Sequence, residues 1–173
     1  MAPRLSPVPA EEAARAKEGS LARFADEGPG HINCAQAVLS FALRVEGMDP
    51  ELITVARYFG GGVAGMGEVC GALSGAALAL GLRDHETERS PAAGGARPER
   101  LPDPKATRGA LQDLMRAFNK EFEAVRCRDL TGCDLTTPEG HDAFVKSGAN
   151  QRCPLFVSWV CDRLLPLLDT HAS

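Results

Sequence analysis

Thiol groups are the side chains of this chain best suited to chemistry, because six of its 173 residues are cysteines. They are Cys34, Cys70, Cys127, Cys133, Cys153 and Cys161. We expect a cytoplasmic protein, and in that compartment cysteines act more often as metal ligands or redox centres than as disulfide staples. The sequence therefore points to chemistry on sulfur.

The spacing of the cysteines excludes several common sites. No Cys-x-x-Cys pair is present, which removes the thioredoxin motif and the zinc-ribbon knuckle. No Cys-x-x-Cys-His motif is present either, so we expect no haem c. The glycine run at 59–67 is not followed by Gly-Lys-Ser or Gly-Lys-Thr, and nucleotide binding is not expected.

Four cysteines fall near the ends of expected helices. Cys34, Cys70 and Cys153 lie at helix starts, where free backbone amides and the helix dipole favour a thiolate and lower the pKa of the thiol. Cys127 lies at the end of an expected helix, between two arginines. These four residues are the candidate site.

The remaining cysteines and the histidines have other expected roles. Cys161 lies in a leucine-rich stripe and is expected in the core as a small hydrophobic residue. Cys133 is either an exposed loop thiol or a spare ligand. His31, three residues before Cys34, is either a surface loop residue or a ligand or proton donor beside the site. The other histidines fall in expected surface segments: His85, His141 and His171.

The hydrophobic pattern predicts an all-α fold, a compact bundle of about five to seven helices, because helical periodicity recurs and no alternating strand pattern is found. The expected helices span residues 10–26, 34–46, 50–59, 69–82, 105–126, 137–147 and 153–168. A glycine-rich turn at 59–67 precedes the helix that carries Cys70-Gly71-Ala72 and the spaced Gly75. That turn can approach another group closely.

One helical domain is expected over residues 1–173, since a chain of this length can bury an ordinary core. Residues 1–9 are expected to form a flexible N-terminus. Residues 83–104 are expected to form a mobile insertion, because four prolines and a Gly-Gly pair occur there with few large apolar side chains.

Charge and hydropathy limit the partners. A net charge of −4 provides no basic field to attract nucleic acid or anionic lipid. The longest apolar tract, residues 75–82, is far shorter than the roughly 18 residues of a membrane span, and residues 1–25 hold no apolar run of signal-peptide length. We expect neither nucleic acid nor a membrane as a partner. A redox partner protein and a homodimer are left open.

Four stretches together resemble a known family. They are Asn33-Cys34-Ala35-Gln36-Ala37-Val38-Leu39, Phe59-Gly60-Gly61-Gly62 leading to Cys70-Gly71-Ala72-Leu73-Ser74-Gly75, Cys127-Arg128-Asp129-Leu130-Thr131-Gly132, and Cys153. From about residue 31 to 165 the chain resembles the redox-active family named C-GCAxxG-C-C. Cys34, Cys70, Cys127 and Cys153 match the four cysteines of its signature.

The resemblance implies an iron–sulfur cluster held by these four cysteines and a role in electron transfer. A similar domain in split-Soret cytochromes is associated with an iron–sulfur centre, but its haem cannot be carried over, because the attachment motif is absent here. Metal-free thiol–disulfide redox chemistry and a structural zinc-binding interaction module are the alternatives. Whether the chain is an enzyme or an electron carrier is left open.

Overall fold

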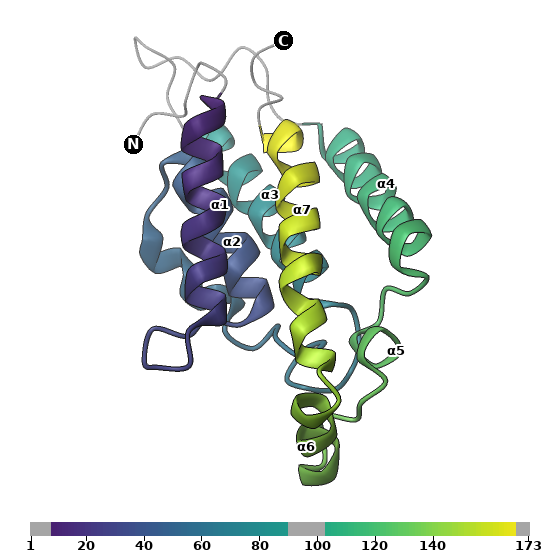
Figure 1. The fold of residues 1–173 in the computed structure, drawn as a ribbon. Coiled ribbons are helices and arrows are strands. Elements are labelled where there is room, and N and C mark those ends of the chain that lie inside the picture. Colours follow the sequence, from purple (N-terminus) through teal and green to yellow (C-terminus); the bar gives the residue numbers. More distant parts are fainter. Residues whose placement is uncertain (1–7, 90–102, 169–173) are drawn as a thin grey trace, which may run out of the picture.

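The computed structural model describes residues 8–89 and 103–168, which form an all-α bundle (Figure 1). These ranges contain seven α-helices, two 3₁₀ helices and no strand. In chain order they are α1 (Ala10–Ala25), α2 (Cys34–Glu46), η1 (Pro50–Ala56), α3 (Gly71–Arg89), α4 (Pro104–Phe122), α5 (Cys127–Thr131), α6 (Pro138–Lys146), η2 (Ala149–Arg152) and α7 (Cys153–Leu168). The predicted fold class is confirmed.

Helix α2 forms the centre of the bundle. Nine of its 13 residues are buried, and it packs against α1, α3, α7 and η1. A helix with apolar residues on most of its circumference is stable only when neighbours cover it on several sides. Its bounds match the expected 34–46, since Asn33 caps the start and Gly47 ends the helix in the left-handed conformation.

Small residues let α2 and α3 approach each other closely. A Cβ atom at Gly75 would lie 2.5 Å from the carbonyl oxygen of Ala35 and 3.0 Å from Cβ of Val38. Any side chain at this position would therefore push the two helices apart. The contact brings the starts of α2 and α3 side by side, where two of the candidate cysteines lie.

Figure 1 shows that several helices begin at one end of the bundle. Helices α1 and α4 run toward the lower end in this view, whereas α2, α3 and α7 begin there and run upward. Helices α5 and α6 also lie at this lower end. The topology therefore collects several helix N-termini in one region.

Two helices have ends that differ from the expected ones. Helix α3 continues to Arg89, so the first seven residues of the expected mobile insertion are helical. They are held because the guanidinium of Arg83 is buried, donates to Thr107 Oγ1 and to the carbonyl oxygen of Leu167, and pairs with Asp84. Residues 90–102 of that segment lie outside the described ranges, and its last two residues, Asp103 and Pro104, form the N-cap and first residue of α4. Helix α4 ends at Phe122 rather than at residue 126.

Smaller differences occur elsewhere. The expected helix at 50–59 is a 3₁₀ helix that ends at Ala56. Of the expected flexible N-terminus, Val8 packs against the core, and residues 1–7 lie outside the described ranges. Across the described part of the chain, no helix combines the length and apolar character needed to cross a membrane.

Candidate functional site

The first turn of α2 positions Cys34. The side-chain oxygen of Asn33 accepts hydrogen bonds from the backbone amides of Ala35 and Gln36, both at 3.0 Å. The side chain of Gln36 in turn accepts from the amide of Asn33 at 3.2 Å, which completes a capping box. Cys34 is therefore the first residue of a helix whose start is firmly defined. Cys153 occupies the same place in α7, as expected.

A short backbone pairing places Cys70 next to Cys127. The amide of Cys70 donates to the carbonyl oxygen of Val125 at 2.8 Å, and the amide of Cys127 donates to that of Glu68 at 2.7 Å. Val69 and Arg126 form the isolated antiparallel bridge between these hydrogen bonds. The pairing joins the end of the glycine-rich loop to the segment between α4 and α5.

Cys127 begins a helix instead of ending one, which corrects the expectation. Helix α4 stops when Glu123 adopts a left-handed conformation with φ of 61°, and α5 begins at Cys127. Cys70 immediately precedes α3, and its carbonyl oxygen accepts the first hydrogen bond of that helix, from Ser74 at 3.0 Å. All four candidate cysteines thus stand at helix N-termini.

The four cysteines line one small cavity. Its wall consists of Cys34, Cys70, Cys127, Leu130, Thr131, Cys153 and Phe156. Cys70 and Cys127 are buried, with 5% and 8% of their surface exposed, and Cys34 and Cys153 are half-buried. Residues that are widely separated in sequence therefore line the same cavity.

Burial makes these thiols weaker acids, which contradicts the expectation of lowered pKa values. Desolvation raises the pKa of Cys34 and of Cys70, raises that of Cys127 to about 11 and raises that of Cys153 to about 12. A negative charge on Cys34 would raise the pKa of each of the other three further. The local effect of a helix start is thus outweighed by exclusion of water, and the metal-free thiols are neutral at pH 7.

The family described as "Putative redox-active protein (C_GCAxxG_C_C)" matches residues 32–166, and this range includes all four cysteines. The chain belongs to this family. No curated protein and no solved structure matches the chain.

The other two cysteines of this C_GCAxxG_C_C protein do not line the cavity. Cys161 is fully buried in the hydrophobic core, which confirms its expected place. Cys133 is also buried, so the exposed-loop interpretation is wrong; its thiol donates to the carbonyl oxygen of Thr131 at 3.4 Å. His31 is exposed, and its Nδ1 lies 2.9 Å from the carbonyl oxygen of Asp26, in keeping with a surface loop residue.

Aromatic and cationic side chains enclose the Cys153 side of the cavity. The ring of Phe156 packs against Phe118 and Phe122 of α4, with centroids 5.8 and 4.9 Å apart. The guanidinium of Arg152 lies 5.6 Å from the centroid of Phe156 and donates to the carbonyl oxygen of Leu130 at 3.0 Å. Its positive charge lowers the pKa of Cys153, although burial raises it by more.

The arginines that flank Cys127 mainly serve the loop pairing. Arg126 forms an ion pair with Glu68 at 2.8 Å, and Arg128 forms one with Asp134 at 3.7 Å. Arg128 also donates to the carbonyl oxygen of Met66 at 3.3 Å. These contacts hold the segment around Cys127 against the glycine-rich loop and against Asp134.

The donor set suits a soft metal centre, but the coordination sphere is not preformed. Four thiols are the ligands typical of zinc or of an iron–sulfur cluster. In residues 8–89 and 103–168, no group of three or more His, Cys, Asp or Glu side chains is arranged to hold a metal ion as it stands. The residues therefore fit such a group by chemistry, and binding would require them to adjust.

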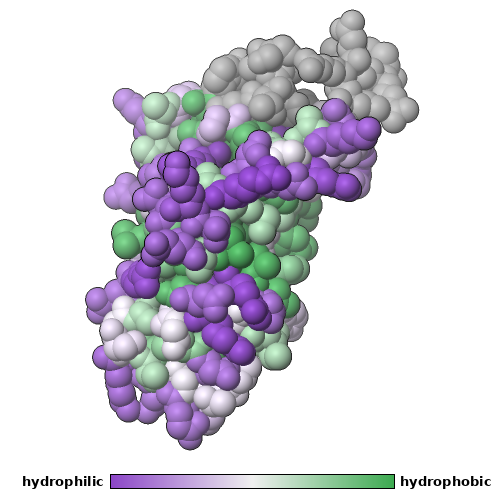
Figure 2. Space-filling view, turned by 90° about the vertical axis from the view of Figure 1, so that its right-hand side faces the viewer, coloured by the Kyte–Doolittle hydropathy of each residue, from purple (hydrophilic) through white to green (hydrophobic). Residues whose placement is uncertain are grey.

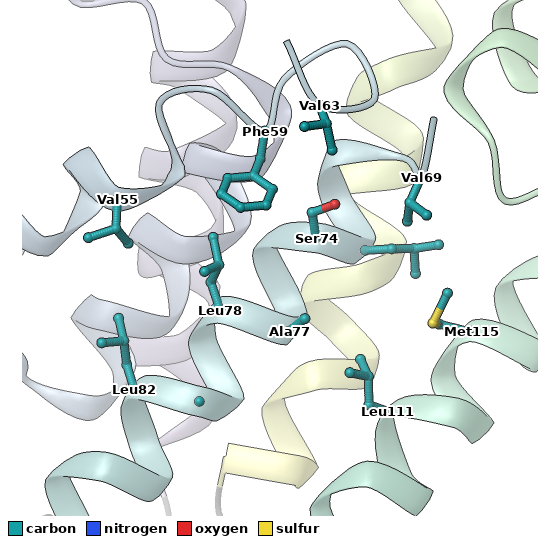
Figure 3. Close-up of a pocket in the computed structure, with 12 residues that line it drawn as sticks. Val55, Phe59, Val63, Val69, Ser74, Ala77, Leu78, Leu82, Leu111 and Met115 are labelled. Atoms are coloured by element: carbon teal, nitrogen blue, oxygen red, sulfur yellow. The ribbon is translucent and has the colours of Figure 1, made fainter. Parts of the chain in front are cut away.

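A second concave region, an apolar groove of about 610 Å³, lies beside this site. Figure 3 shows side chains from η1, the glycine-rich loop, α3 and α4 around it. They include Val55, Phe59, Val69, Leu78, Leu111 and Met115. Figure 2 shows hydrophobic side chains gathered in the middle of one face of the molecule, between hydrophilic ones. Ser74 supplies the hydroxyl group of the groove wall, and this donates to the carbonyl oxygen of Cys70 at 3.4 Å.

Proposed function

We propose that this redox-active family member binds an iron–sulfur cluster through Cys34, Cys70, Cys127 and Cys153 and acts in electron transfer. One observation carries the proposal: four sulfurs from four separate segments share the wall of a single cavity. Cysteines that serve only as small hydrophobic core residues have no reason to lie together. Cys161 is an example, since it is buried in the core away from the cavity.

The protonation of the thiols couples metal binding to proton release. Without a bound metal, the thiols hold their protons, because burial and the negative charge of a neighbouring thiolate both raise the pKa of Cys70, Cys127 and Cys153. Metal binding to cysteine requires the thiolate form and releases these protons. A cluster with iron cations would thus remove the repulsion that now disfavours a second thiolate.

The surrounding residues suit a redox centre. When bound, the cluster supplies one-electron redox chemistry. Leu130 and Phe156 keep water from the sulfurs, and Arg152 contributes positive charge near Cys153. Exclusion of water and nearby charge are two of the factors that set the reduction potential of such centres.

Zinc is a second candidate, and the size of the cavity favours it. The open volume is only about 10 Å³, roughly the room for one water molecule. A cluster needs the four sulfurs to separate further than a single ion does. The third candidate, reversible dithiol–disulfide chemistry, is compatible with all six cysteines being unpaired.

Anaerobic reconstitution with iron and sulfide tests the proposal. We expect stoichiometric iron uptake, visible absorbance and, after reduction, an electron paramagnetic resonance signal. Cys70→Ser removes one ligand and should abolish these signals, whereas Cys161→Ser, a change at a core cysteine outside the cavity, should retain them. Zinc uptake without iron uptake would support the structural module. A reversible two-electron potential in protein that binds no metal would support thiol–disulfide chemistry.

A further inference from the structure

The start of α2 is packed against glycines at three consecutive residues. A Cβ at Gly60 would lie 2.8 Å from Cβ of Asn33, and a Cβ at Gly75 would lie 2.5 Å from the carbonyl oxygen of Ala35. Between them, a Cβ at Gly71 would collide with the Sγ atom of Cys34. The three glycines come from the glycine-rich loop and from two successive turns of α3.

Gly71 has the least room of these positions. Its missing side chain leaves the Cys34 sulfur directly against the backbone at the start of α3. A Cβ there would also lie 3.0 Å from the carbonyl oxygen of Phe59 and 3.3 Å from the amide nitrogen of Ala35. Backbone surrounds this point, so the sulfur is the atom that would have to move if a side chain were added.

Backbone amides also influence the same sulfur. The amides of Gly61, Ala35 and Gly71, together with that of Cys34 itself, act to lower the pKa of the Cys34 thiol, although burial raises it by more. Gly61 has a φ of 64°, a conformation that glycine adopts without strain. By contrast, one such amide, that of Ala72, lowers the pKa of Cys70, and none does so for Cys127 or Cys153. Among the four cavity cysteines, Cys34 is thus the one that the most backbone amides influence.

We propose that Gly71 is a positioning residue that holds the Cys34 sulfur against these amides and thereby raises the reduction potential of the site. This inference rests on the proposed redox function. When an external one-electron donor reduces the site, the added negative charge falls partly on the ligating sulfurs. Amide hydrogen bonds to a sulfur stabilise that charge, so the reduced form gains more than the oxidised form.

Two readouts test the proposal on the full-length chain. In the reconstituted protein, Gly71→Ala should shift the midpoint potential to a lower value, because the sulfur is moved away from its donors. In metal-free protein, the same change should increase the labelling of Cys34 by a small alkylating reagent relative to Cys161, measured by mass spectrometry. The second readout does not depend on any metal.

The chain offers a matched control and a milder variant. Gly81→Ala is the same substitution in the same helix, at a position where a Cβ would meet nothing within 4 Å, and should change neither readout. Gly61→Ala strains one amide donor without entering the contact between α2 and α3, so it should shift the potential in the same direction by a smaller amount. If circular dichroism shows that Gly71→Ala does not fold, Gly61→Ala decides.

The outcomes separate the two proposals. Potentials and Cys34 labelling that match those of Gly81→Ala in both test variants would overturn the role of Gly71. If wild-type protein binds no iron, the cluster proposal fails, but a rise of Cys34 labelling in Gly71→Ala would still support positioning of this sulfur. If Cys34 labelling stays unchanged while wild-type protein binds iron normally, the cluster proposal stands and the positioning proposal falls.

Discussion

Residues 69–74, at the start of α3, contribute to both the cysteine cavity and the apolar groove. Cys70 faces the cavity, whereas Val69, Leu73 and Ser74 line the groove. The cavity has about 10 Å³ of open volume and four thiols, and the groove has about 610 Å³ and no ionisable side chain in its wall. The larger of these two concave regions is thus the one without thiols or ionisable side chains.

The two regions also differ in what holds them together. Backbone hydrogen bonds and capping define the cavity, since the amides of Cys70 and Cys127 both pair across to another segment. The groove is a gap between apolar side chains of several helices. Substitutions at the cavity should therefore change chemistry, and substitutions at the groove should change only packing.

The largest expected contrast is in metal uptake. Cys127→Ser should reduce iron uptake on anaerobic reconstitution at least tenfold, because a weaker oxygen ligand replaces one of four thiolates. Met115→Leu in the groove conserves volume and should retain wild-type uptake. Iron and sulfide assays on the purified proteins measure both. Equal loss in the two variants would show that the groove shares the site's function.

A second contrast concerns pH. Folding raises the pKa of a buried thiol above its value in the unfolded chain, which is near 9. The folded state therefore keeps its full stability below pH 9 and loses part of it as the pH rises toward the folded pKa, because only the unfolded chain ionises in that range. For Cys127, with a folded pKa of about 11, the loss amounts to roughly 2–3 kcal/mol between pH 9 and 11. Urea unfolding of metal-free protein measures it.

The control for this pH effect is a pair of variants. Cys127→Ala should make the fall in stability between pH 9 and 11 smaller by about the Cys127 share, while the other buried thiols with raised pKa values still contribute to it. Met115→Leu should keep the wild-type slope, since the groove wall contributes no ionisable group. An unchanged slope in Cys127→Ala would mean that this thiol is not desolvated in the folded protein.

Helix packing between α2 and α3 provides a third test. Gly75→Ala places a methyl group against the carbonyl oxygen of Ala35 and should destabilise the protein by about 1–3 kcal/mol. Gly81→Ala has open space and should stabilise it by up to about 1 kcal/mol, because alanine favours the helix over glycine. Thermal unfolding of both variants gives the comparison. Equal effects of the two substitutions would show that α2 and α3 have room for a side chain at position 75.

Local signals predicted most of the fold and three of the four cysteine positions. Asn33 and Thr137 cap α2 and α6, which begin at or within one residue of the expected starts, and Cys153 opens α7 before a proline. The expected core side of α7, including Cys161, is buried. These features depend on residues within one turn of each other, which explains why the sequence was sufficient.

Features set by distant segments were not predictable. Nothing in residues 119–126 marks a helix end, since Glu123 takes a left-handed conformation that usually belongs to glycine. The start of α5 depends on pairing with Glu68, nearly 60 residues away. The thiol pKa values were misjudged for the same reason, because burial comes from the whole bundle and outweighs the dipole of a single helix.

The smallest expected effect separates the backbone pairing beside the cavity from the charges around it. The ion pair between Glu68 and Arg126 is about half exposed on both sides, and such pairs contribute at most about 1 kcal/mol. Glu68→Gln removes the charge but keeps the carbonyl oxygen that accepts from the amide of Cys127. Stability should change by less than about 1 kcal/mol in urea unfolding, and iron uptake should stay at the wild-type level. Because the backbone pairing is unaffected by this change, a large loss of uptake would mean that charge, and not the pairing of the two segments, sets the position of Cys127.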